Sequence, residues 1–324
     1  MSTLYSIGEV LIDFVANEKG KGLDEVEAFT KLPGGAPANV AAAVSKYGHQ
    51  SSMITKLGKD SFGDFLTAVL KDAGVKTDKI LRTAEAPTGL AFVSLKDNGE
   101  RDFAFYRKPS ADLLLSADEI GEDWFTKGDL LHFCSVDLVE SPMKYAHAKA
   151  IELVKKAGGV VSFDPNIRLP LWEDEKACQS TVHEFLPKAD IVKVSDEELE
   201  FITGITEEKQ ALQSLFTGDV KVVVYTKGAA GAEIWLKDKF YPSEGHRVEA
   251  IDTTGAGDAF IGGFLAKLME YSVNDENIEE VIRVNYHDIL RFANASGALT
   301  TTRKGAISGL PTVEEINELM FQLV

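Results

Sequence analysis

The chain has only two cysteines, no long apolar run and an excess of acidic over basic residues. Cys134 and Cys178 are too few for a disulfide framework, so we expect two buried, reduced thiols. No apolar run approaches the length that spans a membrane. Residues 1–16 lack the basic region of a signal peptide and carry Glu9 and Asp13. These absences predict a cytoplasmic protein.

The charge balance limits the possible partners. Lys and Arg number 34 against 51 Asp and Glu, which gives a net charge of −17. Nucleic acids and anionic membrane surfaces select basic patches, so neither is expected as a partner. A phosphorylated small ligand would have to be held by local backbone amides, a few cationic side chains and a metal ion.

Several catalytic signatures are also missing. No Gly-x4-Gly-Lys-Ser/Thr motif occurs, which excludes a Walker-type nucleotide site. No Gly-x-Ser-x-Gly elbow occurs, which argues against a serine hydrolase. The six histidines are scattered without the spacing of zinc ligands, so zinc catalysis is not expected.

The pattern from residue 129 onward predicts an α/β fold. Short apolar runs, read as buried strands, alternate with helical stretches near 141–157, 173–187 and 195–203. Such alternation implies βαβ units and a mainly parallel sheet covered on both faces, with ligands gathering at the carboxyl ends of the strands. The predicted strands are Leu130 to Cys134, Val160 to Phe163, Ile191 to Val194 and Val220 to Tyr225.

The first 110 residues differ from this pattern. Besides a strand at 4–10 and helices at 39–47 and 62–73, they contain alternating segments at 89–95 and 101–107. Asn98-Gly99 between these two segments is a strong hairpin signal. We therefore expect one domain over 1–324, with a small β-sheet lid built from about 13–33 and 87–107.

The most informative motif is Asp-Thr-Thr-Gly-Ala-Gly-Asp at 252–258, just before a predicted helix at 259–271. A helix start leaves free N–H groups and a partial positive charge, and glycines at 255 and 257 let an anion approach the backbone. Asp258 beside an anion site suits a base that takes a proton from a hydroxyl attacking phosphorus. A dinucleotide fingerprint would need a third glycine where Phe260 stands. The remaining alternative is an ordinary strand-to-helix turn.

Other motifs suit a polyol and a phosphate, and each also has a purely structural explanation. Gly34 and Gly35 precede a helix whose Asn39 offers a donor and an acceptor, and Asp13 follows an apolar strand. Phe103, Phe105 and Arg107 alternate, so on a lid they would cover a sugar ring and supply a charge, or else form ordinary sheet packing.

Three further segments follow predicted strands. Arg168, after Asp-Pro-Asn at 164–166, is a candidate clamp on a transferred phosphate. Ser195 and Glu198 form a capping box, and Glu198 could also hold a hydrated Mg²⁺. The segment 226–231 could cradle phosphates or simply make a turn.

These pieces occur in the order and spacing of the ribokinase/PfkB family of sugar kinases, which the chain resembles over nearly all 324 residues, most closely in its fructokinase branch. The paired-glycine motif with Asn39 resembles the first family signature and 252–258 the second. Fructokinase-like segments are 34–41, 109–112 and 164–172. One departure is Ser195, which stands where the family commonly has Asn.

The resemblance implies a ribokinase-like three-layer α/β fold with a β lid, and ATP- and Mg²⁺-dependent phosphorylation of a primary sugar hydroxyl. It implies Asp258 as the general base and the amides of Gly255, Ala256 and Gly257 as an anion hole, with Arg168 beside them. Asp13, Gly34, Gly35 and Asn39 match sugar-binding positions of the family, and we add Phe103, Phe105, Arg107, Asn166, Arg168 and Asp258 as candidates for the sugar. Thr226, Gly228, Gly231 and Asn294 match nucleotide-binding positions, and we add Lys193, Ser195, Gly255 and Gly257 as candidates for the nucleotide. Implied metal positions are Glu198 for Mg²⁺ through water, and Asp252, Thr254, Thr300, Arg303 and Gly305 for a monovalent cation such as K⁺.

Alternatives remain open at this point. D-fructose is the expected substrate, with 2-keto-3-deoxygluconate as a rival whose carboxylate Arg107 and Arg168 could bind. A non-catalytic sugar- or nucleotide-binding member of the family is a second alternative. Exposed lid strands could also pair between subunits, which makes a homodimer possible.

Overall fold

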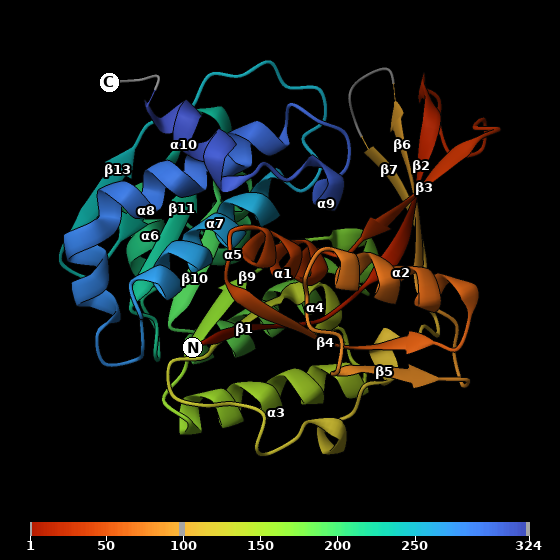
Figure 1. The fold of residues 1–324 in the computed structure, drawn as a ribbon, viewed down its shortest axis with the longest axis horizontal. Coiled ribbons are helices and arrows are strands. Elements are labelled where there is room, and N and C mark those ends of the chain that lie inside the picture. Colours follow the sequence, from red (N-terminus) through yellow and green to blue (C-terminus); the bar gives the residue numbers. More distant parts are fainter. Residues whose placement is uncertain (1, 97–100, 322–324) are drawn as a thin grey trace.

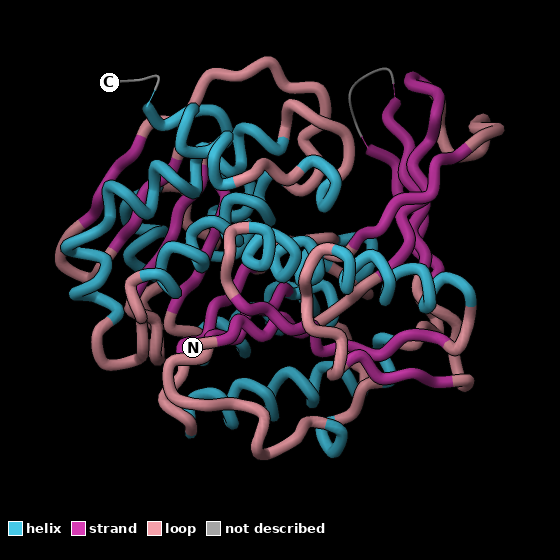
Figure 2. The backbone as a smooth tube through the Cα atoms, viewed as in Figure 1, coloured by secondary structure: helices cyan, strands magenta, loops and turns pink. Residues whose placement is uncertain are grey.

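The computed structural model describes residues 2–96 and 101–321, and its strands form two separate sheets (Figure 1). Within these residues, nine strands form one sheet in the order β13-β12-β11-β10-β9-β8-β1-β4-β5, and four form another in the order β3-β2-β6-β7. Figure 2 shows the smaller sheet projecting from the body at the upper right. The predicted α/β fold with a small β lid is confirmed.

The large sheet is parallel from β5 to β11, and β12 and β13 extend it antiparallel. Strands β8 to β11 are apolar runs because both faces of the sheet are covered. The strands are β1 (Thr3–Ile7), β4 (Gln50–Gly58), β5 (Ile80–Thr83), β8 (Leu130–Cys134), β9 (Val160–Asp164), β10 (Ile191–Ser195), β11 (Val222–Thr226), β12 (Ala232–Trp235) and β13 (Phe240–Ser243).

Helices cover both faces of this sheet, which gives three layers. Alternate residues of one strand enter different cores: Val222 and Val224 pack with α1, α7 and α8, whereas Val223 and Tyr225 pack with α3 to α6. Among the described residues, no helix combines the length and apolarity that crossing a membrane requires. The helices are α1 (Ala36–Lys46), α2 (Ser61–Asp72), α3 (Pro142–Lys156), α4 (Glu175–Phe185), α5 (Asp196–Thr203), α6 (Glu208–Ser214), α7 (Ala256–Glu270), α8 (Ile278–Thr300), α9 (Ala306–Gly309) and α10 (Val313–Phe321).

The small sheet, called the lid below, consists of β2 (Leu11–Gly20), β3 (Phe29–Gly34), β6 (Leu90–Lys96) and β7 (Arg101–Tyr106). Strands β6 and β7 pair antiparallel, as the alternating pattern predicted. The predicted Asn98-Gly99 turn between them lies outside the described residues. Strand β2 joins the two hairpins by pairing antiparallel with β3 and parallel with β6.

Helices α1 and α7 approach closely because small residues line their contact. A Cβ on Gly262 would lie 2.6 Å from the Cβ of Ala43, so Gly262 cannot carry a side chain without a shift. One turn earlier on both helices, the Asn39 side chain meets Asp258. The equal spacing means that the two helices run in the same direction and that their N-termini meet.

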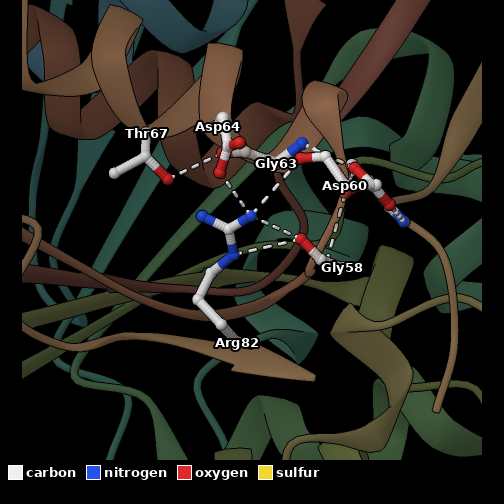
Figure 3. Close-up of polar contacts among 7 residues, drawn as sticks. Gly58, Asp60, Gly63, Asp64, Thr67 and Arg82 are labelled. Carbon is white, nitrogen blue, oxygen red and sulfur yellow. Dashed lines mark hydrogen bonds and ion pairs between the residues drawn. The ribbon is translucent and has the colours of Figure 1, made fainter. Parts of the chain in front are cut away.

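A polar network fixes the segment that leads into β6. The Asp60 carboxylate caps α2 by accepting from Gly63 N–H at 2.8 Å, and it also accepts from the Thr88 N–H and hydroxyl, each at 2.8 Å. Arg82 donates to the Gly58 carbonyl and to Asp64, as Figure 3 shows. Because Thr88 is buried, its donors depend on Asp60.

We expect Asp60→Ala to lower the free energy of unfolding by about 2–4 kcal/mol, since it removes a helix cap and leaves the buried donors of Thr88 unpaired. Asp174, which caps α4 by accepting from Ala177 N–H, is the matched control. Asp174→Ala should cost only about 1 kcal/mol. Urea unfolding measures both values, and equal losses would contradict the role given to Thr88.

Candidate functional site

A polar pocket of about 230 Å³ lies at the carboxyl ends of the parallel strands. Three segments build it: the loop after β9, the junction of β10 with α5, and the start of α7. Its lining residues are Asn166, Ile167, Arg168, Lys193, Ser195, Glu197, Glu198, Thr253, Gly255, Gly257 and Asp258. The edge of the sheet where ligands were expected therefore holds eight of the predicted site residues.

The start of α7 forms one wall of the pocket. Gly255 has φ 77°, and a Cβ there would lie 2.4 Å from the Cβ of Ala306, so the turn requires glycine. The first α-helical hydrogen bond runs from Ala259 N–H to the Gly255 carbonyl, at 2.8 Å. The preceding amides lie at the open, partly positive end of the helix. Three amides were predicted to bind the anion. That of Ala256 already donates to the Thr253 carbonyl at 3.3 Å, so the amides of Gly255 and Gly257 are the better candidates for anion binding.

Asp258 stands in the first turn of α7 and faces the pocket. Asn39 Nδ2 donates to Asp258 Oδ2 at 2.8 Å, which joins two predicted site residues 219 positions apart. Burial raises the pKa of Asp258 above its ordinary value, while the Asn39 hydrogen bond and the charges of Lys193 and Arg168 act in the opposite direction. A carboxylate with a raised pKa is a better proton acceptor than an ordinary aspartate.

Lys193 is held by Asp164, a residue that sequence reasoning gave no role. Its Nζ donates to Asp164 Oδ2 at 2.9 Å, and both side chains are buried. Burial raises the pKa of Asp164 to about 6 despite the adjacent ammonium. Burial alone would lower the pKa of Lys193, but Asp164 and Glu198 reverse this, so Lys193 stays charged. The strand register explains this contact. Strands β9 and β10 pair in parallel at Ser162↔Ile191 and Phe163↔Val192, so Asp164 and Lys193 are the next residues on the two adjacent strands.

Glu198 closes the capping box that the sequence predicted. Its Oε2 accepts from the Ser195 N–H at 3.0 Å and the Ser195 hydroxyl at 2.8 Å, and its Oε1 accepts from Ile167 N–H at 2.8 Å. Although burial alone would raise the pKa of Glu198, Lys193 and these donors lower it, so the side chain is ionised. Within the described residues no cluster of three or more His, Cys, Asp or Glu could hold a metal. Glu198 is a single carboxylate that already accepts hydrogen bonds from the protein, and such a group fits a Mg²⁺ ion that is bound through water.

The predicted sugar-binding residues meet where the lid joins the body. An added Cβ on Gly34 would lie 2.1 Å from Asp13 Oδ2, so the carboxylate occupies the space that the glycine leaves. Gly35 has φ 110° and abuts the Glu9 carbonyl. In the lid register Asp13 pairs with Ala91 and Ala91 with Phe105, so Asp13 and Phe105 lie on one face. Phe103 and Phe105 stack at 5.7 Å on that face.

Arg107 departs from its prediction. Expected as a charge over a sugar, its side chain is only 4% exposed and is ion-paired with Asp112 and Asp137. Arg107 directly follows β7, where the alternating pattern ends, and the chain there enters the body. A charge predicted to face a ligand is therefore engaged in the protein interior.

The predicted nucleotide residues lie farther along the same sheet edge. Thr226 ends β11 opposite Ser195 in the parallel register. Gly228 and Gly231 form the turn into β12, both with positive φ. Asn294 of α8 donates to Ser243 Oγ at 3.1 Å and to the Glu244 carbonyl at 3.2 Å, which brings α8 to this edge. These residues extend the site beyond the pocket itself.

The predicted cation residues are also brought together. Asp252 accepts from Thr254 N–H and Gly305 N–H, each at 3.0 Å, and its own N–H donates to the Thr301 carbonyl. Segments 251–255 and 300–306 therefore lie side by side behind the start of α7. The predicted cation ligands in the second segment are the backbone carbonyls of Thr300, Arg303 and Gly305, and their role stays a prediction. The side chain of Arg303 pairs with Glu315.

Comparison with known proteins gives the family. The chain matches the pfkB family carbohydrate kinase profile over residues 1–313. The chain belongs to the PfkB family of carbohydrate kinases. It is 42% identical to fructokinase-1 of Zea mays over 97% of this chain and 96% of that protein.

Two solved structures place this carbohydrate kinase in the same fold. A fructokinase double mutant from Vibrio cholerae O395, bound to fructose, ADP and potassium ion, has a TM-score of 0.86 and 36% identity over 99% of this chain and 98% of that one. A fructokinase with bound ATP from Xylella fastidiosa has a TM-score of 0.88 and 33% identity over 99% and 98%. The ribokinase-like fold inferred from the sequence is confirmed.

The hydrogen bond from Asn39 predicts the pH dependence of this kinase. With Asp258 as the predicted base, which must be ionised to act, kcat/KM should fall as the pH drops through its pKa, which is raised above that of an ordinary aspartate. Asn39→Ala removes an interaction that favours the charged form, so the acid limb should move to higher pH. Arg168→Ala should move it less, since that charge acts more weakly on Asp258.

Profiles of kcat/KM against pH, measured for the sugar, test this order. Asn294→Ala is the control, since it removes an amide at the far end of the site and should leave the acid limb in place. An unmoved limb in Asn39→Ala would show that Asp258 does not set the acid limb.

Proposed function

We propose that this protein is an ATP-dependent fructokinase that converts D-fructose to fructose 6-phosphate. The observation that carries this proposal is the placement of Asp258, held by Asn39, at the open end of α7 and facing a pocket that also contains Lys193. Its relatives support the substrate, since the maize and Vibrio proteins are named fructokinases and the Vibrio structure contains fructose and ADP.

Asp258 accepts the proton of the sugar 6-hydroxyl as that oxygen forms a bond to the γ-phosphorus of ATP. The bond from the γ-phosphorus to the β,γ-bridging oxygen breaks, and ADP leaves with the bonding electrons. Transition states of this kind are loose, so positioning and charge neutralisation supply most of the catalysis. The amides of Gly255 and Gly257 face the charge that develops on the phosphoryl oxygens.

Cationic side chains complement those amides. Lys193, kept ionised by Asp164, and Arg168 provide positive charge at the pocket of a chain whose net charge is −17. Glu198 would hold Mg²⁺ through water, and the ion would neutralise phosphate charge when bound. Thr226, Gly228, Gly231 and Asn294 would contact the nucleotide.

The segments 251–255 and 300–306 would bind a monovalent cation through backbone carbonyls. The Vibrio structure contains potassium ion, which agrees with that assignment. A cation there would fix the turn that orients the amides at the start of α7.

The rival substrate 2-keto-3-deoxygluconate requires cations for its carboxylate. Arg107, one of the two arginines considered for this task, is buried and engaged by Asp112 and Asp137. Arg168 would then have to bind both the carboxylate and the phosphate. The neutral hexose fits the available charges better.

The first test is ADP release with Mg-ATP and fructose, 2-keto-3-deoxygluconate, ribose or glucose, with and without K⁺. We expect strong turnover on fructose, stimulation by K⁺ and little ATP hydrolysis without sugar. Faster turnover of 2-keto-3-deoxygluconate than of fructose would contradict the assignment of fructose as the substrate. Silence with all four sugars would overturn the proposed activity.

Asp258→Asn should lower kcat by about 10²- to 10⁴-fold with the fold intact, since the proton acceptor is lost. Asp196→Asn is the control, because Asp196 is an exposed acid in the first turn of α5, outside the pocket lining. Its turnover should match the parent enzyme. Near-normal turnover in Asp258→Asn, with unchanged circular dichroism, would remove Asp258 from the mechanism.

Other predictions stay open to experiment. The assignment of 1–324 to one domain, the homodimer through lid strands and the cytoplasmic location stay predictions. Among the described residues, β3 and β7 are the two edge strands of the lid, so a dimer formed by strand pairing would use one of them.

A further inference from the structure

A buried cluster of charged side chains lies at the root of the lid, outside the pocket lining. It consists of Glu9, Arg107, Asp112 and Asp137, all buried, and it is called the root cluster below. Arg107 is ion-paired with both aspartates. Glu9 interacts electrostatically with Arg107 and Asp137. Nothing in the proposed chemistry uses these four groups.

All four lid strands join the body at this cluster. Glu9 precedes β2 by two residues, and Arg107 directly follows β7. Gly89 directly precedes β6, and an added Cβ there would lie 3.5 Å from both Arg107 Cγ and Asp112 Oδ1. At the end of β3, Gly35 abuts the Glu9 carbonyl, and the Glu9 carboxylate accepts from Ala36 N–H at 2.9 Å.

The two aspartates belong to the body. Asp112 begins the 3₁₀ helix η1 (Asp112–Leu114), and Asp137 ends η3 (Ser135–Asp137), just beyond β8. Arg107 therefore joins the exit of a lid strand to two body segments through one rigid guanidinium, which can bind two carboxylates at once.

The charges of the cluster depend on Arg107. Its three carboxyl groups outnumber its one guanidinium, and burial raises the pKa of Asp137 to about 7 and that of Glu9 well above its ordinary value. Within the described residues, one polar atom of each side chain, namely Glu9 Oε2, Arg107 Nε, Asp112 Oδ1 and Asp137 Oδ2, has no hydrogen-bond partner. Because Arg107 is the one cation among three acids, loss of its guanidinium would leave the buried carboxyl groups of Glu9, Asp112 and Asp137 without a compensating charge.

We infer that Arg107 is a positioning residue that anchors the lid to the body through Asp112 and Asp137 and so sets the placement of Asp13 and Phe105 over the sugar. The anchor acts on sugar binding through the lid and does not touch the sugar. The anchoring of the lid does not depend on the proposed function, whereas its consequence for sugar binding rests on it.

The test compares Arg107→Met with Asp190→Asn. Asp190 is a matched control, since it is a buried acid whose cationic partners are Lys155 and Lys221. It directly precedes β10 and so lies at the amino ends of the strands, away from the lid. Hydrogen exchange without substrate should be at least ten-fold faster in lid strands β2, β6 and β7 of Arg107→Met, with β8 to β10 unchanged. Asp190→Asn should leave lid exchange at the parent value.

Kinetics supply the second readout. Arg107→Met should raise KM for the sugar at least ten-fold, leave KM for ATP unchanged and increase the fraction of ATP hydrolysed without transfer. Arg107→Lys, which keeps the charge but loses the fork, should fall between Met and the parent. Parental lid exchange and parental sugar KM in Arg107→Met would overturn the inference.

A double variant covers the case in which Arg107→Met does not fold. Arg107→Met with Asp137→Asn removes one buried acid together with the cation, so it should fold but still show fast lid exchange. Slow, parental exchange in that double variant would overturn the anchor. If the parent enzyme fails to phosphorylate fructose, the proposed function fails, while the exchange data still decide the inference.

Discussion

The site depends on the close contact between α1 and α7. Gly262 against Ala43 lets the two helices approach, and the equal spacing one turn earlier sets Asn39 against Asp258. Each helix begins directly after a glycine with positive φ, Gly35 for α1 and Gly255 for α7, so the turns that precede the two helices lie next to each other. A side chain at position 262 would separate the helices, and Asp258 would lose its hydrogen bond from Asn39. The packing of small residues in the core thus decides the geometry of Asp258, the proposed proton acceptor.

The site also resolves a conflict between net charge and ligand. A chain with charge −17 repels a polyphosphate at long range, so attraction must come from nearby groups. The fold supplies it by placing Lys193 in a buried pair with Asp164, and the start of α7 beside it. In low-dielectric surroundings these few charges and dipoles act more strongly than the same groups in water. Burial therefore strengthens the effect of the few cationic groups, and it also raises the pKa of Asp258, the proposed base.

Much of this could be predicted from the sequence. Strands β8 to β11 were found within two residues of their bounds, since strands buried on both faces are unbroken apolar runs. The lid was found from alternation, and the capping box from Ser195 and Glu198 alone. The bounds of the antiparallel strands β12 and β13, and helices α8 to α10, were not predicted. Arg107 was misjudged because alternation tells which face a residue takes within a strand, and Arg107 lies just past the end of its strand. Its pairing with Asp137 depends on chain topology, which local patterns do not encode.

The lid and Asp258, the proposed base, are linked by a short stretch of backbone. Asp13 fills the space left by Gly34, Gly35 packs on the Glu9 carbonyl, and the Glu9 carboxylate accepts from the N–H of Ala36, the first residue of α1. Three residues later on α1, Asn39 holds Asp258. A shift of the lid root relative to the body must therefore be absorbed between Asp13 and the helix α1, whose Asn39 holds Asp258. Two glycines allow the close approach there, and a buried ion cluster resists displacement. The placement of Asp13 and the orientation of Asp258 are thus coupled through this one backbone segment, which joins the proposed sugar site to the proposed base.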